Sequence, residues 1–211
     1  MLYYDRYYSL VEIGGQCWFA ENLATDKYSN GDLLGQDMSL SGQNNSSWFN
    51  ATSGMYSIAN ESLSNDVIYG KLYNWYAAVD GRGVCPIGWH TPSDCEWMFL
   101  EKSVGVALSE LEFTGNRGGS SGNAIKSTAG WSLPNTLANN SSGFSALPGG
   151  IRGEMAIPIT LGYSGYWWAE SKNESNITNL HARKLQSSSA SIYRYQNMYT
   201  FSGLSIRCIK D

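Results

Sequence analysis

Apolar and polar residues alternate over short stretches of this chain, which indicates short strands more often than long helices. Residues 11–20 read VEIGGQCWFA, where the apolar Val11 and Ile13 flank a glutamate and precede a Gly-Gly pair and a second apolar run. That order predicts a β-hairpin. Residues 24–65 are rich in Asn, Ser and Gly with isolated aromatic residues, so we expect long loops there, and residues 115–130 are predicted to form another loop.

Two segments carry apolar residues at the spacing of a helix. In the first, within residues 69–79, these residues are Leu72, Trp75, Tyr76 and Val79. The second begins near Thr91, a candidate N-cap, because Pro92 fits the first helical position and Asp94 stands three residues after the cap. Its core-facing side would be formed by Trp97, Leu100 and Val104. Residues 86–90 between the two segments are predicted to form a turn and a strand.

Composition narrows the fold and the kind of partner. The chain has 211 residues, the size of one domain, and combines 15% charged residues with 23 glycines and 14 tyrosines. This balance disfavours a helical bundle and favours short strands joined by loops. The net charge of −4 and the scattered Lys and Arg residues give no basis for binding nucleic acid or an anionic membrane. No apolar stretch approaches the roughly 20 residues that span a bilayer, and the chain start lacks the apolar core of a signal peptide, so neither membrane insertion nor a visible export signal is expected.

Four cysteines are spread along the chain: Cys17, Cys85, Cys95 and Cys208. Their spacing matches neither a zinc ribbon nor a redox pair. An even number suits two disulfides in an oxidising setting, for which three connectivities exist. The alternative is four reduced cysteines that are buried as small apolar side chains.

The stretch at residues 163–201 has the composition of a binding surface. Its 39 positions hold seven Ser, five Tyr and four Asn residues. Tyr offers a large amphipathic contact area with few rotatable bonds, while Ser and Asn offer adaptable hydrogen bonds, as in antibody paratopes. The alternative is an ordinary polar surface, since surface loops are usually polar.

Side chains alternate between the two faces of a strand, and this rule divides the stretch into inward and outward positions. We expect Ile192 to point inward together with Arg194, which would reach a partner at the rim of the sheet, and Tyr193 and Tyr195 to point outward. The tryptophan pair at residues 167–168 would face opposite sides, with one ring near the binding surface. The candidate ligand-binding residues are Ser164, Trp167, Asn173, Ser175, Asn176, Asn179, His181, Ser187, Ser189, Ser191, Tyr193, Tyr195, Asn197 and Tyr199.

Catalytic and metal-binding chemistry has little support in the sequence. Of the two histidines, His181 has no evident Ser, Cys or Asp partner, and His90 is expected to make a buried structural hydrogen bond. An enzyme is therefore not predicted, and no cofactor or dedicated metal site is expected. Three loop residues could admit a calcium ion, although they do not follow the EF-hand pattern: Asp26, Asp32 and Asp37.

Six blocks carry a family resemblance: GGQCWFAENL at 14–23, YGKLYNWYAA at 69–78, CPIGWHTPS at 85–93, LPGGIR at 147–152, GYWW at 165–168 and GLSIRC at 203–208. Together they resemble the Fibrobacter succinogenes major paralogous domain, which is similar to the C-type-lectin-like and formylglycine-generating-enzyme-like folds. The resemblance implies an α+β fold of the C-type-lectin type, with two helices, a twisted antiparallel sheet and long loops. It also implies one domain over residues 1–211, with a loop-rich insertion at about 38–64. Leu204 departs from the family pattern, in which an aromatic residue is usual.

The family pattern also bears on the cysteines. The cysteine of the Cys-Pro-x-Gly-Trp block and the one near the C-terminus recur together in that family. The resemblance therefore implies a disulfide between Cys85 and Cys208, which leaves Cys17 to pair with Cys95.

A second resemblance concerns the function of the domain. C-type-lectin-like domains are the display scaffold of diversity-generating retroelements, in which adenine-directed mutagenesis randomises a C-terminal stretch between fixed framework residues. The mixture of Asn, Ser, Tyr, Thr and His at residues 164–199 looks like such an outcome, whereas Glu170, Lys184 and Gln186 cannot arise from an AAC codon and are either fixed or encoded by another template codon. The resemblance implies a non-catalytic protein, extracellular, at a cell surface or virion-associated, that binds a protein or glycan ligand on a cell or virus surface.

Two alternatives remain open. The first is a surface-adhesion or glycan-binding domain without hypervariability. Many C-type lectins hold sugars through calcium, but the Glu-Pro-Asn or Gln-Pro-Asp signature of that site is absent here. The second is a relative of the formylglycine-generating oxidases, which would need a reactive cysteine pair in a cleft near the C-terminus.

Overall fold

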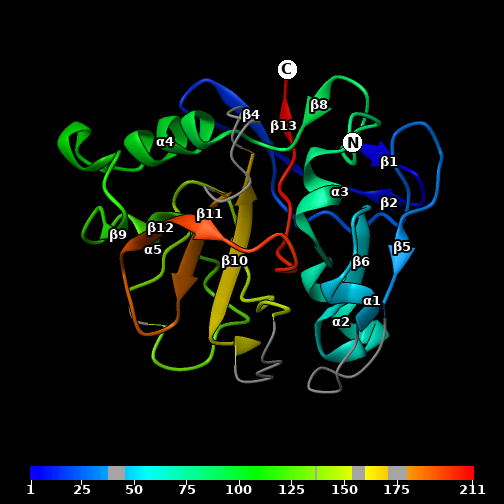
Figure 1. Ribbon diagram of the computed structural model, residues 1–211. Coiled ribbons are helices and arrows are strands. Elements are labelled where there is room, and N and C mark those ends of the chain that lie inside the picture. The colour runs from blue at the N-terminus through cyan, green and yellow to red at the C-terminus, as the bar shows by residue number, and fades with distance from the viewer. Residues whose placement is uncertain (38–45, 136, 154–159, 171–179) are drawn as a thin grey trace.

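The computed structural model describes residues 1–37, 46–135, 137–153, 160–170 and 180–211 (Figure 1). Its strands are β1 Leu2–Tyr3, β2 Arg6–Tyr7, β3 Leu10–Ile13, β4 Gln16–Phe19, β5 Gly35–Gln36, β6 Met55–Ile58, β7 Lys71–Tyr73, β8 Trp89–His90, β9 Gly115–Arg117, β10 Ser164–Ala169, β11 Leu180–Gln186, β12 Ile192–Met198 and β13 Ile209–Lys210. Its α-helices are α1 Ser46–Phe49, α2 Leu63–Tyr69, α3 Trp75–Val79, α4 Asp94–Ser103 and α5 Gly122–Ile125, and two 3-10 helices are η1 Ala59–Glu61 and η2 Leu108–Glu110.

The strands form several small sheets, and their order is β10-β11-β12-β9, β3-β4-β13-β8, β5-β6-β7 and β1-β2. All strand pairs except β5 with β6 are antiparallel. Helices and mainly antiparallel sheets therefore coexist, which confirms the α+β class. The expected pair of helices is a simplification, because five α-helices lie in the described residues and only α4 reaches ten residues.

The predicted N-terminal hairpin is confirmed. Strands β3 and β4 pair antiparallel, with Val11 opposite Trp18. The turn between them needs a left-handed backbone at two successive residues, and Gly14 and Gly15 supply it with φ values of +62° and +83°. Residues with a Cβ adopt that conformation only with strain, which explains the Gly-Gly pair.

Both predicted helices form, but each begins later than predicted. Helix α4 is capped by Ser93 instead of Thr91. The Ser93 hydroxyl accepts from the backbone N–H of Glu96, and the Glu96 carboxylate accepts from the N–H of Ser93, which completes a capping box. Helix α3 begins at Trp75 because the side chain of Asn74 accepts from the N–H three residues later. Leu72 consequently lies in strand β7 instead of in a helix.

The long loops predicted from Asn, Ser and Gly content contain more regular structure than expected. Residues 46–65 of that region include α1, β6 and η1, and residues 115–130 include β9 and α5. Part of the reason is tertiary pairing: β6 hydrogen-bonds to β7, and β9 to β12. Polar composition lowers local strand propensity, but a partner strand supplies the hydrogen bonds that stabilise it. Part of the predicted insertion, residues 38–45, lies outside the described residues.

The apolar core has two parts, and strand β10 forms a wall between them. All six residues of β10 are buried. Trp167 points into the part formed with Trp97 and Leu185, and Trp168 points into the part formed with Trp75. Because both faces of β10 are covered, Trp167 is 1% exposed and Trp168 0% exposed. The expectation that one of the two lies near a binding surface is therefore wrong.

The C-terminal segment joins the sheets to one another. It runs through the centre of the molecule between α3 and β10 in Figure 1, where Leu204 pairs with Tyr73 and Ser205 with Trp167. Further along, Ile209 pairs with both β4 and β8. The segment is thus a shared strand-like element of three sheets.

One disulfide, between Cys85 and Cys208, ties that segment to the loop between α3 and β8, and it confirms the predicted pairing. The second expected disulfide is absent, because Cys17 and Cys95 are both free. Trp18 of β4 packs on Trp97 of α4, with ring centroids 5.3 Å apart. Its neighbour Cys17 must therefore point to the opposite side of the strand, away from the helix that carries Cys95.

Candidate ligand-binding face

The β10-β11-β12-β9 sheet has one face against α4 and one face that is partly open. Strand register places Tyr166, Lys184 and Tyr193 in one row across β10, β11 and β12, and Tyr195 in the next row. Side chains in such rows lie on the same side of the sheet. We call these four residues the tyrosine face.

The rings and the ammonium group of the tyrosine face contact one another. The ring centroids of Tyr193 and Tyr195 are 4.4 Å apart, and those of Tyr166 and Tyr195 are 6.2 Å apart. Lys184 Nζ lies 5.4 Å from the centroid of Tyr166 and 6.0 Å from that of Tyr193. Tyr166 is buried, and the other three are half-buried. The face is therefore an aromatic platform with a cation at its centre.

Burial shapes the charge of this platform. It lowers the pKa of Lys184. Burial also raises the pKa of Tyr195, with smaller contributions from Tyr166 and Tyr193, and it raises the pKa of Tyr166 itself. Tyrosine hydroxyls are already protonated at neutral pH, and these upward shifts keep those of Tyr166 and Tyr195 protonated to higher pH, so they can donate as well as accept hydrogen bonds.

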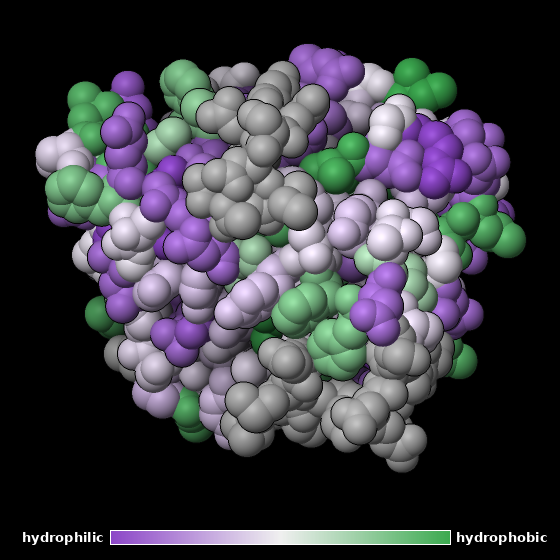
Figure 2. Space-filling model, viewed as in Figure 1, coloured by the Kyte–Doolittle hydropathy of each residue, from purple (hydrophilic) through white to green (hydrophobic). Residues whose placement is uncertain are grey.

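The predicted alternation along β12 is confirmed. Ile192 and Arg194 are buried at 0% and 5% exposure, whereas Tyr193 and Tyr195 lie on the other side and remain half-buried. Beyond the strand, Tyr199 is 64% exposed and stacks on Phe201, with ring centroids 5.0 Å apart. The surface over β11 and β12 in Figure 2 carries mainly purple and near-white residues, as expected for Tyr, Ser and Asn.

Some other candidate residues also lie where a ligand can reach them. Asn197 is exposed near the end of β12. Ser189 and Ser191 are half-buried in the turn between β11 and β12, where their hydroxyl oxygens are 2.8 Å apart. The candidates Asn173, Ser175, Asn176 and Asn179 lie outside the described residues.

Four other candidates are not open to a ligand on the tyrosine face, although Ser164 lies on the same side of β10 as Tyr166. Ser164, Trp167 and Ser187 are 4%, 1% and 5% exposed, so a ligand could contact them only after rearrangement. Trp167 is buried because it packs into the core. Backbone hydrogen bonds hold the serines in place, between Gly150 N–H and the carbonyl of Ser164 and between Ser187 N–H and the carbonyl of Tyr163. His181 is half-buried on the side facing α4, with Nδ1 3.4 Å from the Asp94 carboxylate.

A buried charge cluster, which the sequence reasoning missed, connects this sheet to α4. The Asp94 carboxylate accepts from Arg183 Nη1 at 2.7 Å and from Arg194 Nη2 at 2.5 Å. Glu101 accepts from Arg183 Nε at 2.6 Å and also from Arg117. The prediction that Arg194 reaches a partner at the sheet rim is wrong, because Arg194 is buried against Asp94. Its position between two outward tyrosines already indicates that it points inward, toward a buried partner. The cluster fixes the strands that carry the tyrosine face.

Burial alone would raise the pKa of Asp94. The hydrogen bond from Arg194 and the charges of Arg183 and His181 together outweigh it and hold the pKa below its usual range. The carboxylate is therefore ionised throughout the neutral range and serves as a permanent anchor for both arginines.

His90 has a structural position, as expected, although it is only half-buried. Its Nδ1 lies 2.6 Å from the Asp211 carboxylate and its Nε2 2.8 Å from that of Glu96. The hydrogen bond with Glu96, followed by that with Asp211, raises the pKa of His90 to about 9. A histidinium thus links α4 to the C-terminal residue at neutral pH.

The loop aspartates do not converge on a cation. Asp32 pairs with Arg82, and Asp37 pairs with Arg152 in a different part of the molecule. Among the described residues, no group of three or more His, Cys, Asp or Glu side chains is arranged to hold a metal ion. Within the same residues, no helix is both long and apolar enough to cross a bilayer.

Comparison with known proteins adds one finding. Residues 11–210 match the family model of the Fibrobacter succinogenes major domain, which covers nearly the whole chain. No curated protein and no solved structure gives a significant match.

Proposed function

The chain belongs to the Fibrobacter succinogenes major domain family, and we propose that it is a non-catalytic ligand-binding member of it. The tyrosine face, together with Ser189, Ser191, Asn197 and Tyr199, contacts the ligand. The ligand is a protein or a glycan presented on a cell or virus surface.

The observation that carries this proposal is the separation of fold-defining and outward side chains along β12. Ile192 and Arg194 are buried and bound to the rest of the molecule, while the intervening Tyr193 and the following Tyr195 face outward. Outward positions of such a strand can change with little effect on the core. Half-buried tyrosines with nearby Ser and Asn also lose little side-chain entropy when they bind.

Two finer statements belong to the same proposal. The fold is of the C-type-lectin type, supported by the family, the α+β class and the disulfide that joins the third of the six family blocks to the last one. The outward positions are diversified by a retroelement, supported by the Tyr, Ser and Asn content of residues 163–201. A reverse-transcriptase gene beside a near-copy of the C-terminal coding segment would support diversification, and a neighbourhood without both would contradict it.

The rival oxidase function has a specific chemical requirement. It needs two reactive thiols in a cleft near the C-terminus. Cys208 is fully buried and bonded to Cys85, so its sulfur is not available as a nucleophile while the bond is intact. The adhesion alternative uses the same tyrosine face and differs only in lacking diversification.

The test compares an outward variant with a matched inward variant. Tyr193→Ser combined with Tyr199→Ser should remove binding on a printed glycan array or to a panel of immobilised bacterial surface proteins, after wild type has identified the positive probe. Its melting temperature should fall by only several degrees, because the two ring pairs that it loses, Tyr193 with Tyr195 and Tyr199 with Phe201, are each worth about 1 kcal/mol. Tyr195 is left in place because it also packs against the core.

The inward control is Ile192→Asp, which buries an unpaired charge and should prevent folding or cost several kcal/mol. If the double tyrosine variant unfolds as readily as this control, the tyrosines are part of the core and the proposal is wrong. A folded variant with unchanged binding would place the ligand elsewhere on the molecule.

A further inference from the structure

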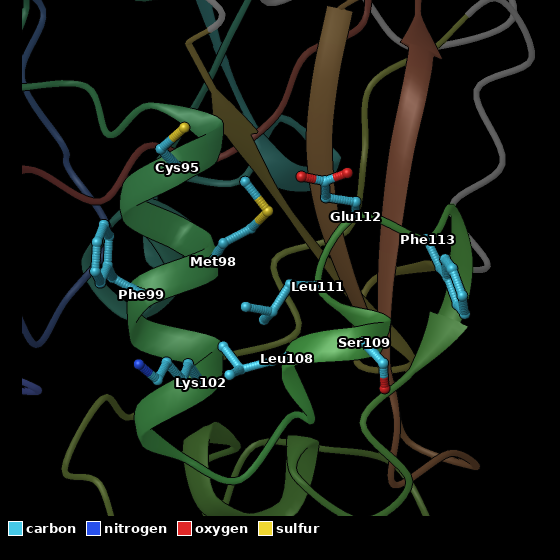
Figure 3. A pocket seen from close by; sticks show the side chains of 9 residues that line it. All are labelled: Cys95, Met98, Phe99, Lys102, Leu108, Ser109, Leu111, Glu112 and Phe113. Atoms are coloured by element: carbon cyan, nitrogen blue, oxygen red, sulfur yellow. The ribbon is translucent and has the colours of Figure 1, made fainter.

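A second surface, distinct from the tyrosine face, has the properties of a docking site. Helix α4, helix η2 and the residues that follow η2 enclose a groove of about 440 Å³ (Figure 3). It is lined by Cys95, Met98, Phe99, Lys102, Leu108, Ser109, Leu111, Glu112 and Phe113. In Figure 3, Met98, Leu108 and Leu111 point toward the middle of the groove, and Phe99 and Phe113 stand at its two flanks.

The groove is built into the fold. One of its walls is α4, whose other side packs into the core through Trp97 and Leu100. The facing wall is held by Arg194, whose Nη1 donates to the backbone carbonyl of Glu112 at 2.8 Å. The Glu110 carboxylate accepts from the N–H of Gly118 at 2.7 Å. Both walls are therefore fixed before any partner arrives.

The side chains around the groove are unusually apolar for an exposed surface. Phe99, Leu108 and Phe113 all line this groove, and they are 59%, 68% and 61% exposed. Contiguous apolar patches on a soluble protein generally mark an interaction surface. The patch has protruding rings at its flanks and a hollow at its centre. A ring of one copy could therefore fit into the hollow of another.

The charges of the groove indicate which partner covers it. Lys102 and Glu112 are both exposed and lie at opposite ends of the groove, at the lower left and the upper right of Figure 3. A two-fold axis through the middle would bring Lys102 of one copy against Glu112 of the other, twice. Such an isologous contact requires a self-complementary patch, and an apolar centre between opposite charges meets that requirement.

We propose that this groove is a homodimer interface, in which a second copy of the chain docks through α4, η2 and residues 111–113. This goes beyond the proposed ligand binding and does not depend on it. The tyrosine face lies on the side of the sheet that faces away from α4, so both copies keep it open. Two faces in one particle would raise the apparent affinity for a repetitive surface through avidity.

Charge reversal tests the two-fold geometry, measured by sedimentation velocity of the full chain across a concentration series. Wild type should show a monomer–dimer equilibrium. Lys102→Glu alone and Glu112→Lys alone should each place two like-charge contacts in the interface and raise the dimer Kd at least about tenfold. An equimolar mixture of the two variants should restore dimers, because every contact is then between opposite charges.

A matched pair of apolar variants tests the location. Leu108→Asp should abolish dimers, whereas Leu63→Asp, at a similarly exposed leucine on α2, should leave them unchanged. Circular dichroism confirms that each variant is folded. In a Cys17→Ser background, maleimide labelling of the exposed Cys95 should be slower at dimeric than at monomeric concentrations.

Three results would overturn the proposal. They are a wild type that stays monomeric up to its solubility limit, a charge-reversed mixture that does not regain dimers, and dimers lost in Leu63→Asp but kept in Leu108→Asp.

Discussion

Replacing Asp94 with Asn tests whether the buried charge cluster holds the tyrosine face in place. Asp94 is 8% exposed and receives hydrogen bonds from Arg183 and Arg194. Asn has nearly the same shape, but its amide nitrogen would face a guanidinium N–H, donor against donor. The change also leaves the buried cluster with three arginines, Arg117, Arg183 and Arg194, and only one carboxylate. That carboxylate, on Glu101, pairs with Arg117 and Arg183.

The expected loss is large for a single isosteric change. Removing one partner of a buried ion pair costs about 3–5 kcal/mol, because the remaining charge is left without compensation. Against a total stability of about 5–15 kcal/mol, this is a substantial fraction. For a chain of this size it corresponds to a fall in melting temperature of roughly 6–20 °C.

Urea unfolding followed by tryptophan fluorescence measures the change, with calorimetry to check for two-state behaviour. The matched control is Asp32→Asn, which removes a carboxylate from an exposed pair with Arg82 and should leave the midpoint unchanged. Because the pKa of Asp94 is lowered in the folded protein, its contribution is present above about pH 4 and is lost as the pH falls. If Asp94→Asn costs no more than Asp32→Asn, the cluster is not what holds β11 and β12 to α4.

The remaining predictions concern other parts of the framework. The pKa of His90 is raised to about 9, so its contribution to stability should be complete below pH 6.5 and decline as the pH rises through 9; His90→Gln should remove that decline in thermal melts. Non-reducing peptide mapping should find the Cys85–Cys208 bond and two free thiols, with Cys95 alkylated faster because it is exposed. Reducing the bond should cost roughly 4–5 kcal/mol in the chain-entropy account, since it closes a loop of about 120 residues, and a variant with no loss would contradict that account. Trp168→Ala should cost about 3–5 kcal/mol in urea unfolding because it opens a cavity in the part of the core formed with Trp75, and a smaller loss would show that the core collapses around it.

Local features of the structure could be predicted from the sequence because their causes are local. The hairpin at Gly14 and Gly15 follows from the conformational freedom of glycine. The alternation of Ile192 and Tyr193 along β12 follows from the two-residue period of a strand. The Cys85–Cys208 bond was identified through the family pattern and not through spacing, which left three pairings open.

What occupies the space on each side of a strand was decided only by the tertiary structure. Alternation placed Trp167 and Trp168 on opposite faces, but it could not show that both faces are covered, because the covering segments come from distant parts of the chain. The same holds for Arg194, whose partner Asp94 is 100 residues away.

The sequence by itself determined which side chains share a face, which residues can form a tight turn and to which family the chain belongs. The tertiary structure decided which faces are open, which cysteines can meet and where exposed apolar residues gather into a groove. The physical reason is that backbone geometry repeats over two to four residues, whereas burial depends on contacts between segments that the sequence keeps far apart.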